Sequence, residues 1–192
     1  MRIAIATRCA VSAALYVACS TGTSAGKNDM NADHAMGHTA SSPSTTSGTV
    51  AQASRTLVDR DLERIRHATA AFKSLDAAVA AGYQRNVPQC IAHPTLGGMG
   101  YHHTNDALLD DKLDLDHPEI LVYAKTAAGE YKLNGVEFYV PYSAHPRDAA
   151  PPVIMGQQLT PFDPGKFWYR HVWVWTDNPA GIFADWDPDV KC

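Results

Sequence analysis

The sequence predicts an α+β domain, with an N-terminal amphipathic helix packed on an antiparallel sheet that is either open or barrel-like. Hydrophobic residues recur every three or four positions over 57–81, which is the period of a helix. Three later segments, 120–125, 130–140 and 167–176, are rich in β-branched and aromatic residues, which favour strands. A helix followed by strands, the first two joined by a short turn, is typical of the α+β class.

One apolar stripe defines the predicted helix over 57–81. Thr56 and Asp59 are expected to cap its start. Gly82 suits the left-handed position just after a helix, and Tyr83 the hydrophobic contact that follows it. The stripe consists of Val58, Leu62, Ile65, Thr69, Phe72, Leu75 and Val79.

The predicted strand 130–140 changes phase in its middle. Its apolar residues stand at odd positions before Asn134-Gly135 and at even positions after it. One inserted residue in a β-bulge produces this pattern, and it turns Glu137 away from the apolar side of the strand. The third strand, 167–176, ends at a turn over 178–181, and the Pro-rich stretch 141–164 is predicted to be a long connection.

Composition excludes several classes of protein. The chain has 192 residues, is 45% hydrophobic and 19% charged, and carries a formal net charge of −4, so it is neither fully disordered nor fibrous. Without residues 1–18, which contain Arg2 and Arg8 and no acid, 14 basic residues face 20 acidic ones, a balance of −6. An acidic chain without a basic run is not expected to bind nucleic acid.

The N-terminus has the features of an export signal, and residues 1–18 are predicted to be a signal peptide. The apolar run 9–18 extends about 15 Å as a helix, half of a bilayer core of about 30 Å. Residues 16–19 (YVAC) resemble a lipobox with Cys19 as the lipidated residue, whereas 23–25 suit ordinary signal peptidase; a retained helix is a third alternative. The predicted location is the periplasmic side of a bacterial envelope, lipid-anchored, or the outside of the cell.

Residues 19–53 are predicted to be a disordered tether before a single globular domain at 54–192, because small polar residues dominate and bury almost nothing. The tether contains a Met/His tract, and thioether together with imidazole suits copper. The alternative is a plain polar linker. The tract comprises Met30, His34, Met36 and His38.

Three strings, GGMGYHHTN (97–105), NGVEFYVP (134–141) and YRHVWVWTDNPAGIFADWDPDVKC (169–192), resemble an uncharacterised family of exported bacterial proteins and lipoproteins. The shared motifs are GMG-aromatic-His-x-x-Asn, Val-Glu-aromatic, His-Val-Trp and a C-terminal Cys. His103 stands where the family pattern has an aromatic residue. The resemblance implies export and assigns no activity or catalytic residue.

His102, Glu137 and His171 are the candidate metal ligands. His171 alternates with four aromatic residues, Phe167, Tyr169, Trp173 and Trp175, so it is expected to be dry and neutral, as a ligand must be.

Because an isolated buried carboxylate is very costly, Glu137 would need a metal or a histidine as its partner. His102 follows a glycine-rich segment, expected to be a loop that folds toward the sheet. Two imidazoles and one carboxylate suit Zn, Fe(II) or Mn, with Cu also considered, and His103 or His93 are weaker further ligands. Tyr, Trp or Asn105 side chains are expected to hold the far imidazole nitrogens.

The alternative is a histidine hydrogen-bonded in the core and a glutamate on the surface. On that interpretation the domain is a non-catalytic envelope binding module that uses exposed aromatics such as Tyr101, Trp168 and Trp186, or a copper-handling lipoprotein that uses the Met/His tract. No known catalytic motif is present, so the sequence assigns no enzyme class.

A disulfide between Cys90 and Cys192 is predicted by elimination. Cys9 leaves with the signal peptide and Cys19 is removed or lipidated, so two thiols remain in an oxidising compartment, where such pairs usually bridge.

Overall fold

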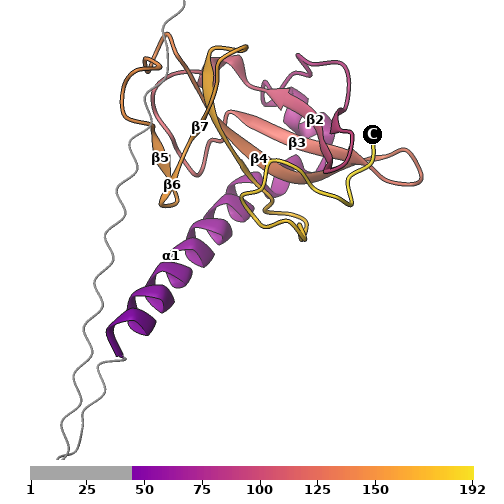
Figure 1. Cartoon of the computed structure of the whole chain (residues 1–192). Coiled ribbons are helices and arrows are strands. Elements are labelled where there is room, and N and C mark those ends of the chain that lie inside the picture. The colour runs from indigo at the N-terminus through magenta and orange to yellow at the C-terminus, as the bar shows by residue number, and fades with distance from the viewer. Residues whose placement is uncertain (1–44) are drawn as a thin grey trace, which may run out of the picture. The chain divides into compact units, whose positions relative to one another are not determined.

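The computed structural model describes residues 45–192 of the chain (Figure 1). The predicted signal peptide, Cys19 and the Met/His tract lie outside these residues. Within the described part, none of the helices is long and apolar enough to cross a membrane. The predicted α+β class is confirmed, because one long helix precedes an antiparallel sheet of six strands.

The sheet is a curled half-barrel with the strand order β1-β2-β3-β4-β8-β7. It is open, since β1 and β7 each have one neighbour among the described strands. In Figure 1 the C-terminal segment crosses in front of the sheet and the end of α1 passes behind it. The six strands are β1 (Ile91–His93), β2 (Gly97–Thr104), β3 (Ile120–Lys125), β4 (Tyr131–Pro141), β7 (Thr160–Phe162) and β8 (Phe167–Val172). A short 3-10 helix, Asp106–Leu108, follows β2, and β5 (Val153–Ile154) pairs with β6 (Gln157–Gln158) apart from the sheet.

The single helix predicted over 57–81 is interrupted in the structure. α1 runs from Thr45 to Thr69, a 3-10 turn occupies Ala70–Lys73, and α2 covers Leu75–Ala80. Ser74 breaks the helix because its backbone is extended and its hydroxyl accepts a hydrogen bond from the N–H of Ala77 at 3.3 Å, as an N-cap does. The predicted cap at Thr56 is wrong, because α1 begins eleven residues earlier, within the stretch predicted as tether, and Thr56 donates to the carbonyl of Gln52.

The end of the helical region agrees with prediction. Gly82 has a φ of +99°, and the N–H groups of Gly82 and Tyr83 donate to the carbonyls of Val79 and Ala78 at 3.1 and 3.0 Å. These two bonds form a Schellman motif. Val79 itself is exposed, so the predicted stripe is buried only in part.

The predicted bulge in β4 is confirmed. Val122 of β3 pairs with Gly135, whereas the next residue, Tyr123, pairs with Leu133, so Asn134 is the extra residue. Leu133 and the even-numbered residues after the bulge therefore face the same side of the sheet, and Glu137 faces the other.

Two strand predictions are corrected. The glycine-rich segment before His102 is a strand, β2, and not a loop. Its glycines fit there because a Cβ at Gly97 would overlap the carbonyl of Asp187, and one at Gly98 would press on Val190. At the other end of the sheet, β8 stops at Val172, four residues before the predicted end of the third strand, and Trp175 turns toward α1, where its indole N–H donates to Thr69 at 3.0 Å.

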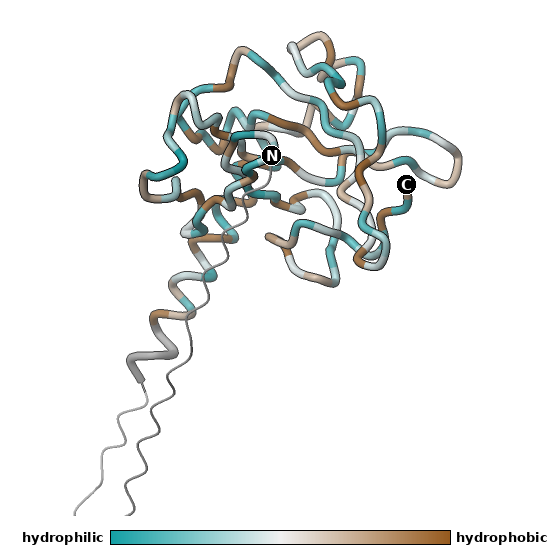
Figure 2. The backbone as a smooth tube through the Cα atoms, turned by 45° about the horizontal axis from the view of Figure 1, so that its top comes forward, coloured by the Kyte–Doolittle hydropathy of each residue, from teal (hydrophilic) through white to brown (hydrophobic). Residues whose placement is uncertain are grey.

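The hydrophobic core lies between α1 and one face of the sheet. Leu62 and Ile65 of α1 are buried there, and along α1 hydrophobic and hydrophilic stretches alternate (Figure 2). Trp168 belongs to this core and is 1% exposed, so it does not form the exposed binding surface predicted for it. The sheet contributes Leu121, Tyr123, Leu133, Val136, Phe138, Val140, Trp168 and Val172.

The C-terminal segment, residues 177–192, covers the opposite face of the sheet. The backbones of Gly98 and Asp187 exchange two hydrogen bonds of 3.0 Å. Val190 packs with Trp173 and Ala124. The predicted disulfide between Cys90 and Cys192 is confirmed, with its Cα atoms 5.5 Å apart. The bond ties the end of the segment to the chain just before β1.

Because the disulfide closes a loop of 102 residues, its loss should destabilise the fold. The chain-entropy model gives up to about 4–5 kcal/mol for a loop of this length. Urea unfolding of the full chain with and without reductant measures the change. In the double variant Cys90→Ser/Cys192→Ser, reductant should leave the unfolding midpoint unchanged; an equal response in both proteins contradicts this assignment.

Replacing Gly100 of β2 with alanine should destabilise the fold more than the same replacement at Gly129 in the β3–β4 turn. Both have positive φ, +108° and +83°, but an added Cβ overlaps the Tyr123 carbonyl only at Gly100. Gly100→Ala is expected to cost roughly 3 kcal/mol, from strain and overlap together, and Gly129→Ala about 1 kcal/mol. Urea unfolding compares the two, and equal losses would show that β2 does not approach β3 this closely.

Candidate metal centre

Strand register brings His102, Glu137 and His171 to one face of the sheet. Glu137 of β4 lies directly opposite His171 of β8, and directly opposite residues of paired strands share a face. On its other side, Glu137 pairs with Ile120 of β3. Val122 lies two residues further along β3, so it is on the same face as Ile120. Val122 pairs with His102 of β2. The three side chains thus come from three strands, beneath the C-terminal segment.

Their polar atoms converge on one point, as predicted. The Nε2 atoms of His102 and His171 lie 3.2 Å apart, and Oε2 of Glu137 lies 3.2 Å from the first and 3.5 Å from the second. One ligand atom from each residue falls within 4.8 Å of the other two. A shared mononuclear site is therefore geometrically possible.

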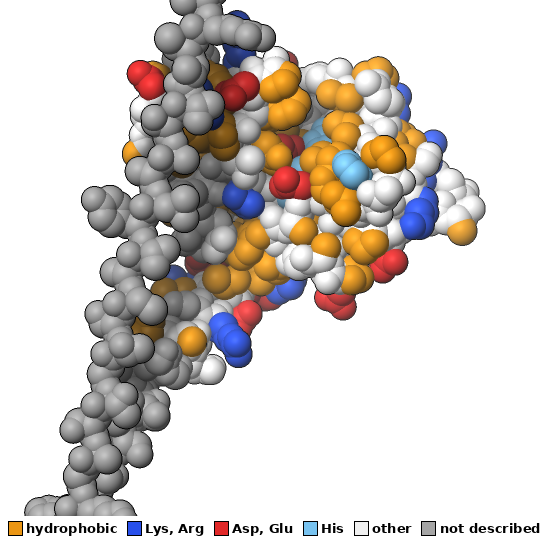
Figure 3. Space-filling view, viewed as in Figure 1, with side chains coloured by type: hydrophobic (Ala, Val, Ile, Leu, Met, Phe, Trp, Pro, Cys, Tyr) orange, Lys and Arg blue, Asp and Glu red, His pale blue; other side chains and the backbone are white. Residues whose placement is uncertain are grey.

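All three residues are buried, with exposed fractions of 6% for His102, 4% for Glu137 and 2% for His171. Burial alone would raise the pKa of Glu137, but the imidazoles of His171 and His102 more than offset it and hold that pKa well below its usual range. The carboxylate is thus an anion that depends on its two neighbours. Histidine side chains are visible among hydrophobic ones on the face seen in Figure 3.

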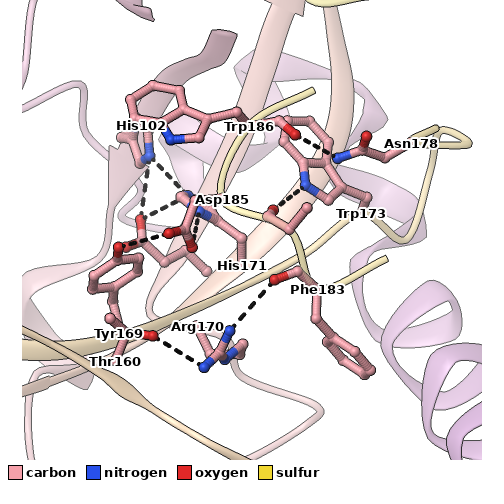
Figure 4. Close-up of polar contacts among 12 residues, drawn as sticks. His102, Thr160, Tyr169, Arg170, His171, Trp173, Asn178, Phe183, Asp185 and Trp186 are labelled. Atoms are coloured by element: carbon pink, nitrogen blue, oxygen red, sulfur yellow. Dashed lines mark hydrogen bonds and ion pairs between the residues drawn. The ribbon is translucent and has the colours of Figure 1, made fainter. Parts of the chain in front are cut away.

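The imidazole nitrogens that point away from Glu137 lack hydrogen-bond partners among the described residues. They are Nδ1 of His102 and Nδ1 of His171. Nδ1 of His171 lies 4.0 Å from Oδ1 of Asp185 (Figure 4). Asp185 in turn accepts a hydrogen bond of 3.0 Å from the hydroxyl of Tyr169, whose pKa is raised by burial and by Asp185, so the hydroxyl keeps its proton.

The weaker candidates lie elsewhere. His103 points to the opposite face, where its ring packs 5.0 Å from that of Tyr123. Nδ1 of His93 accepts from the N–H groups of Thr95 and Leu96 at 3.2 Å, and its ring lies 5.4 Å from that of Trp186. Neither joins the group of converging ligand atoms.

The expectation that Asn105 holds an imidazole is wrong. Its side chain accepts from the N–H of Ala107, at the start of the 3-10 helix, and donates to the carbonyl of Ala81. Trp175 does not line the site either, because β8 ends before it.

Sequence reasoning missed a buried glutamate, Glu119, which precedes β3 and is 1% exposed. Its Oε2 accepts a hydrogen bond of 3.1 Å from the N–H of Tyr139, two residues beyond Glu137. Burial raises the pKa of Glu119 to about 8. Its position beside the acidic stretch 110–116 made it resemble a residue of a solvated loop.

No protein-family model, curated protein or solved structure matches the chain. The resemblance to exported bacterial proteins therefore remains an expectation.

Replacing Glu119 with glutamine should make stability less dependent on pH. Because the pKa of Glu119 is higher in the folded chain, about 8, than in the unfolded chain, about 4.5, the folded state binds more protons between these values. The contribution of Glu119 to the free energy of unfolding is therefore fully present at low pH. It falls by a few kcal/mol as pH rises from about 4.5 to 8. Glu119→Gln keeps the acceptor for Tyr139, and its unfolding free energy should fall less over this range.

Urea unfolding at several pH values, with EDTA present, tests this expectation. Glu130→Gln is the matched control, because Glu130 is exposed, and its pH profile should follow that of the natural chain. A Glu119→Gln profile as steep as that of the control would contradict the assignment.

Proposed function

We propose that this chain is an exported, metal-binding envelope protein whose domain holds one divalent transition-metal ion through His102, Glu137 and His171. The observation that carries the proposal is the spacing of three buried ligand atoms, 3.2, 3.2 and 3.5 Å from one another. Atoms about 2.1 Å from a tetrahedral ion lie about 3.4 Å from each other. The three atoms thus have nearly the spacing of three corners of a zinc tetrahedron.

A cation also accounts for the electrostatics of the site. At most one proton can lie between the two Nε2 atoms, 3.2 Å apart, and in one tautomer of a neutral imidazole Nε2 carries a lone pair that a cation can take. A bound ion takes both lone pairs and the carboxylate charge at once. Three coordinate bonds to the ion would then offset the cost of burying Glu137.

Zn²⁺ is the ion that the donor set and its spacing favour. Two imidazoles and one carboxylate leave a fourth position of a zinc ion open for water or another small ligand. Fe(II), Mn(II) and Cu(II) accept the same donors in other geometries.

Export is supported by two features of the chain. The disulfide between Cys90 and Cys192 is of a kind that persists in oxidising compartments. Residues 1–18 have the charge and length of a signal peptide, and Cys19 follows them as a lipid acceptor. Mass spectrometry and N-terminal sequencing of the protein recovered from cells that express it test this part of the proposal. An intact Met1 contradicts it.

Elemental analysis of the purified full chain after exposure to Zn²⁺ and removal of the excess tests the metal site. The natural chain should retain about one ion at this site. Glu137→Gln and His171→Ala should lose that ion, because each removes a ligand. His117→Ala and Glu130→Gln, which change exposed residues outside the site, are matched controls and should retain the ion.

Near-UV circular dichroism shows whether each variant is folded. The same variants in a chain lacking residues 28–40 separate this site from the Met/His tract, since copper or zinc bound by that tract disappears with the deletion. Equal metal content in the natural chain, Glu137→Gln and His171→Ala would overturn the proposal.

A further inference from the structure

Asp185 lies on the C-terminal segment, on the far side of the His171 ring from the proposed ion. Its Oδ1 is 4.0 Å from Nδ1 of His171, about 1 Å beyond hydrogen-bond length. Its Oδ2 already accepts the hydroxyl hydrogen of Tyr169 at 3.0 Å (Figure 4). The carboxylate is therefore held in place with one oxygen toward an imidazole nitrogen that has no other described partner.

Hydrogen bonds hold the backbone on both sides of Asp185. The indole N–H of Trp173 donates to the carbonyl of Ala184 at 2.6 Å, and the amide of Asn178 donates to the carbonyl of Trp186 at 3.0 Å. Further along, the backbone pair between Gly98 and Asp187 and the disulfide fasten the rest of the segment. Asp185 is thus kept over the site, although it belongs to no strand, and its side chain needs to move by only about 1 Å to accept from Nδ1 of His171.

A metal-bound histidine is stabilised by such a partner. When Nε2 binds an ion, the ring proton must reside on Nδ1, and a buried Nδ1–H without an acceptor is costly. A carboxylate acceptor also makes the ring a stronger ligand by increasing the electron density on Nε2. Asp185 is the carboxylate that lies nearest to this nitrogen among the ion pairs of the described residues.

We propose that Asp185, oriented by Tyr169, is a positioning residue of the metal site, which accepts the Nδ1–H of His171 and thereby fixes the tautomer that binds the ion. This inference rests on the proposed function, since it concerns the same ion. It also gives the C-terminal segment a role: the disulfide holds the segment that carries Asp185.

Zinc affinity of the full chain, measured by competition with a chelating dye at one pH, tests the inference. Asp185→Asn should weaken binding about 10- to 100-fold, the range for loss of such a partner. Asp185→Glu should recover part of this loss, because the carboxylate remains. Asp189→Asn is the matched control: it removes the same charge from an exposed residue of the same segment and should bind like the natural chain.

Two readouts separate positioning from a purely structural role. In the zinc-loaded natural chain, proton NMR should show a hydrogen-bonded Nδ1–H of His171 that Asp185→Asn loses. In EDTA, the urea unfolding midpoints of Asp185→Asn and Asp189→Asn should agree. If Asp185→Asn is already destabilised without metal and its Nδ1–H signal persists with zinc, Asp185 is structural and the proposal fails.

Tyr169→Phe keeps the test decisive if Asp185→Asn does not fold. It leaves the carboxylate but removes the hydroxyl that orients it, so binding should weaken, by less than the loss in Asp185→Asn. A natural affinity in Tyr169→Phe or in a folded Asp185→Asn overturns this inference alone. If the natural chain holds no zinc that depends on His102, Glu137 and His171, the proposed function itself fails.

Discussion

A buried negative charge is the constraint on which this structure depends. The carboxylate of Glu137 lies in the middle of the sheet with 4% of the residue exposed, between two imidazoles and without a lysine or arginine among its described ion pairs. A buried carboxylate with no partner would be protonated or would destabilise the fold by several kcal/mol. The two histidines hold it ionised, and a cation among the three groups would neutralise it fully.

The rest of the fold keeps these groups together and dry. α1 and the core occupy one face of the sheet, so the site can lie only on the other. The bulge at Asn134 turns Glu137 to that face, opposite His171. The glycines of β2 let the C-terminal segment approach closely, and the disulfide fastens its last residue. A site built from three strands and a C-terminal segment held by a disulfide is preorganised, which lowers the entropic cost of ordering it when a ligand binds.

The sequence predicted the parts of this arrangement that follow from periodicity and elimination: the apolar stripe, of which the α1 part is largely buried, the bulge in β4, the pairing of Cys90 with Cys192 and the three converging side chains. It did not predict β2 as a strand, because glycine is a poor strand former by itself and only the approach of the Asp187 backbone explains it. Asp185 and Glu119 were missed for a related reason: their surroundings come from distant segments, and nothing near them in the sequence marks burial or a partner.

X-ray absorption spectroscopy of the zinc-loaded full chain tests the central claim most directly, because it reports the atoms around the ion itself. We expect four light ligands at about 2.0–2.1 Å with the multiple-scattering pattern of two imidazoles, and no such zinc signal in His171→Ala, which should not retain the ion. A zinc shell without imidazole scattering, or one that is the same in His171→Ala, would contradict the account, since His102 and His171 would then not share an ion.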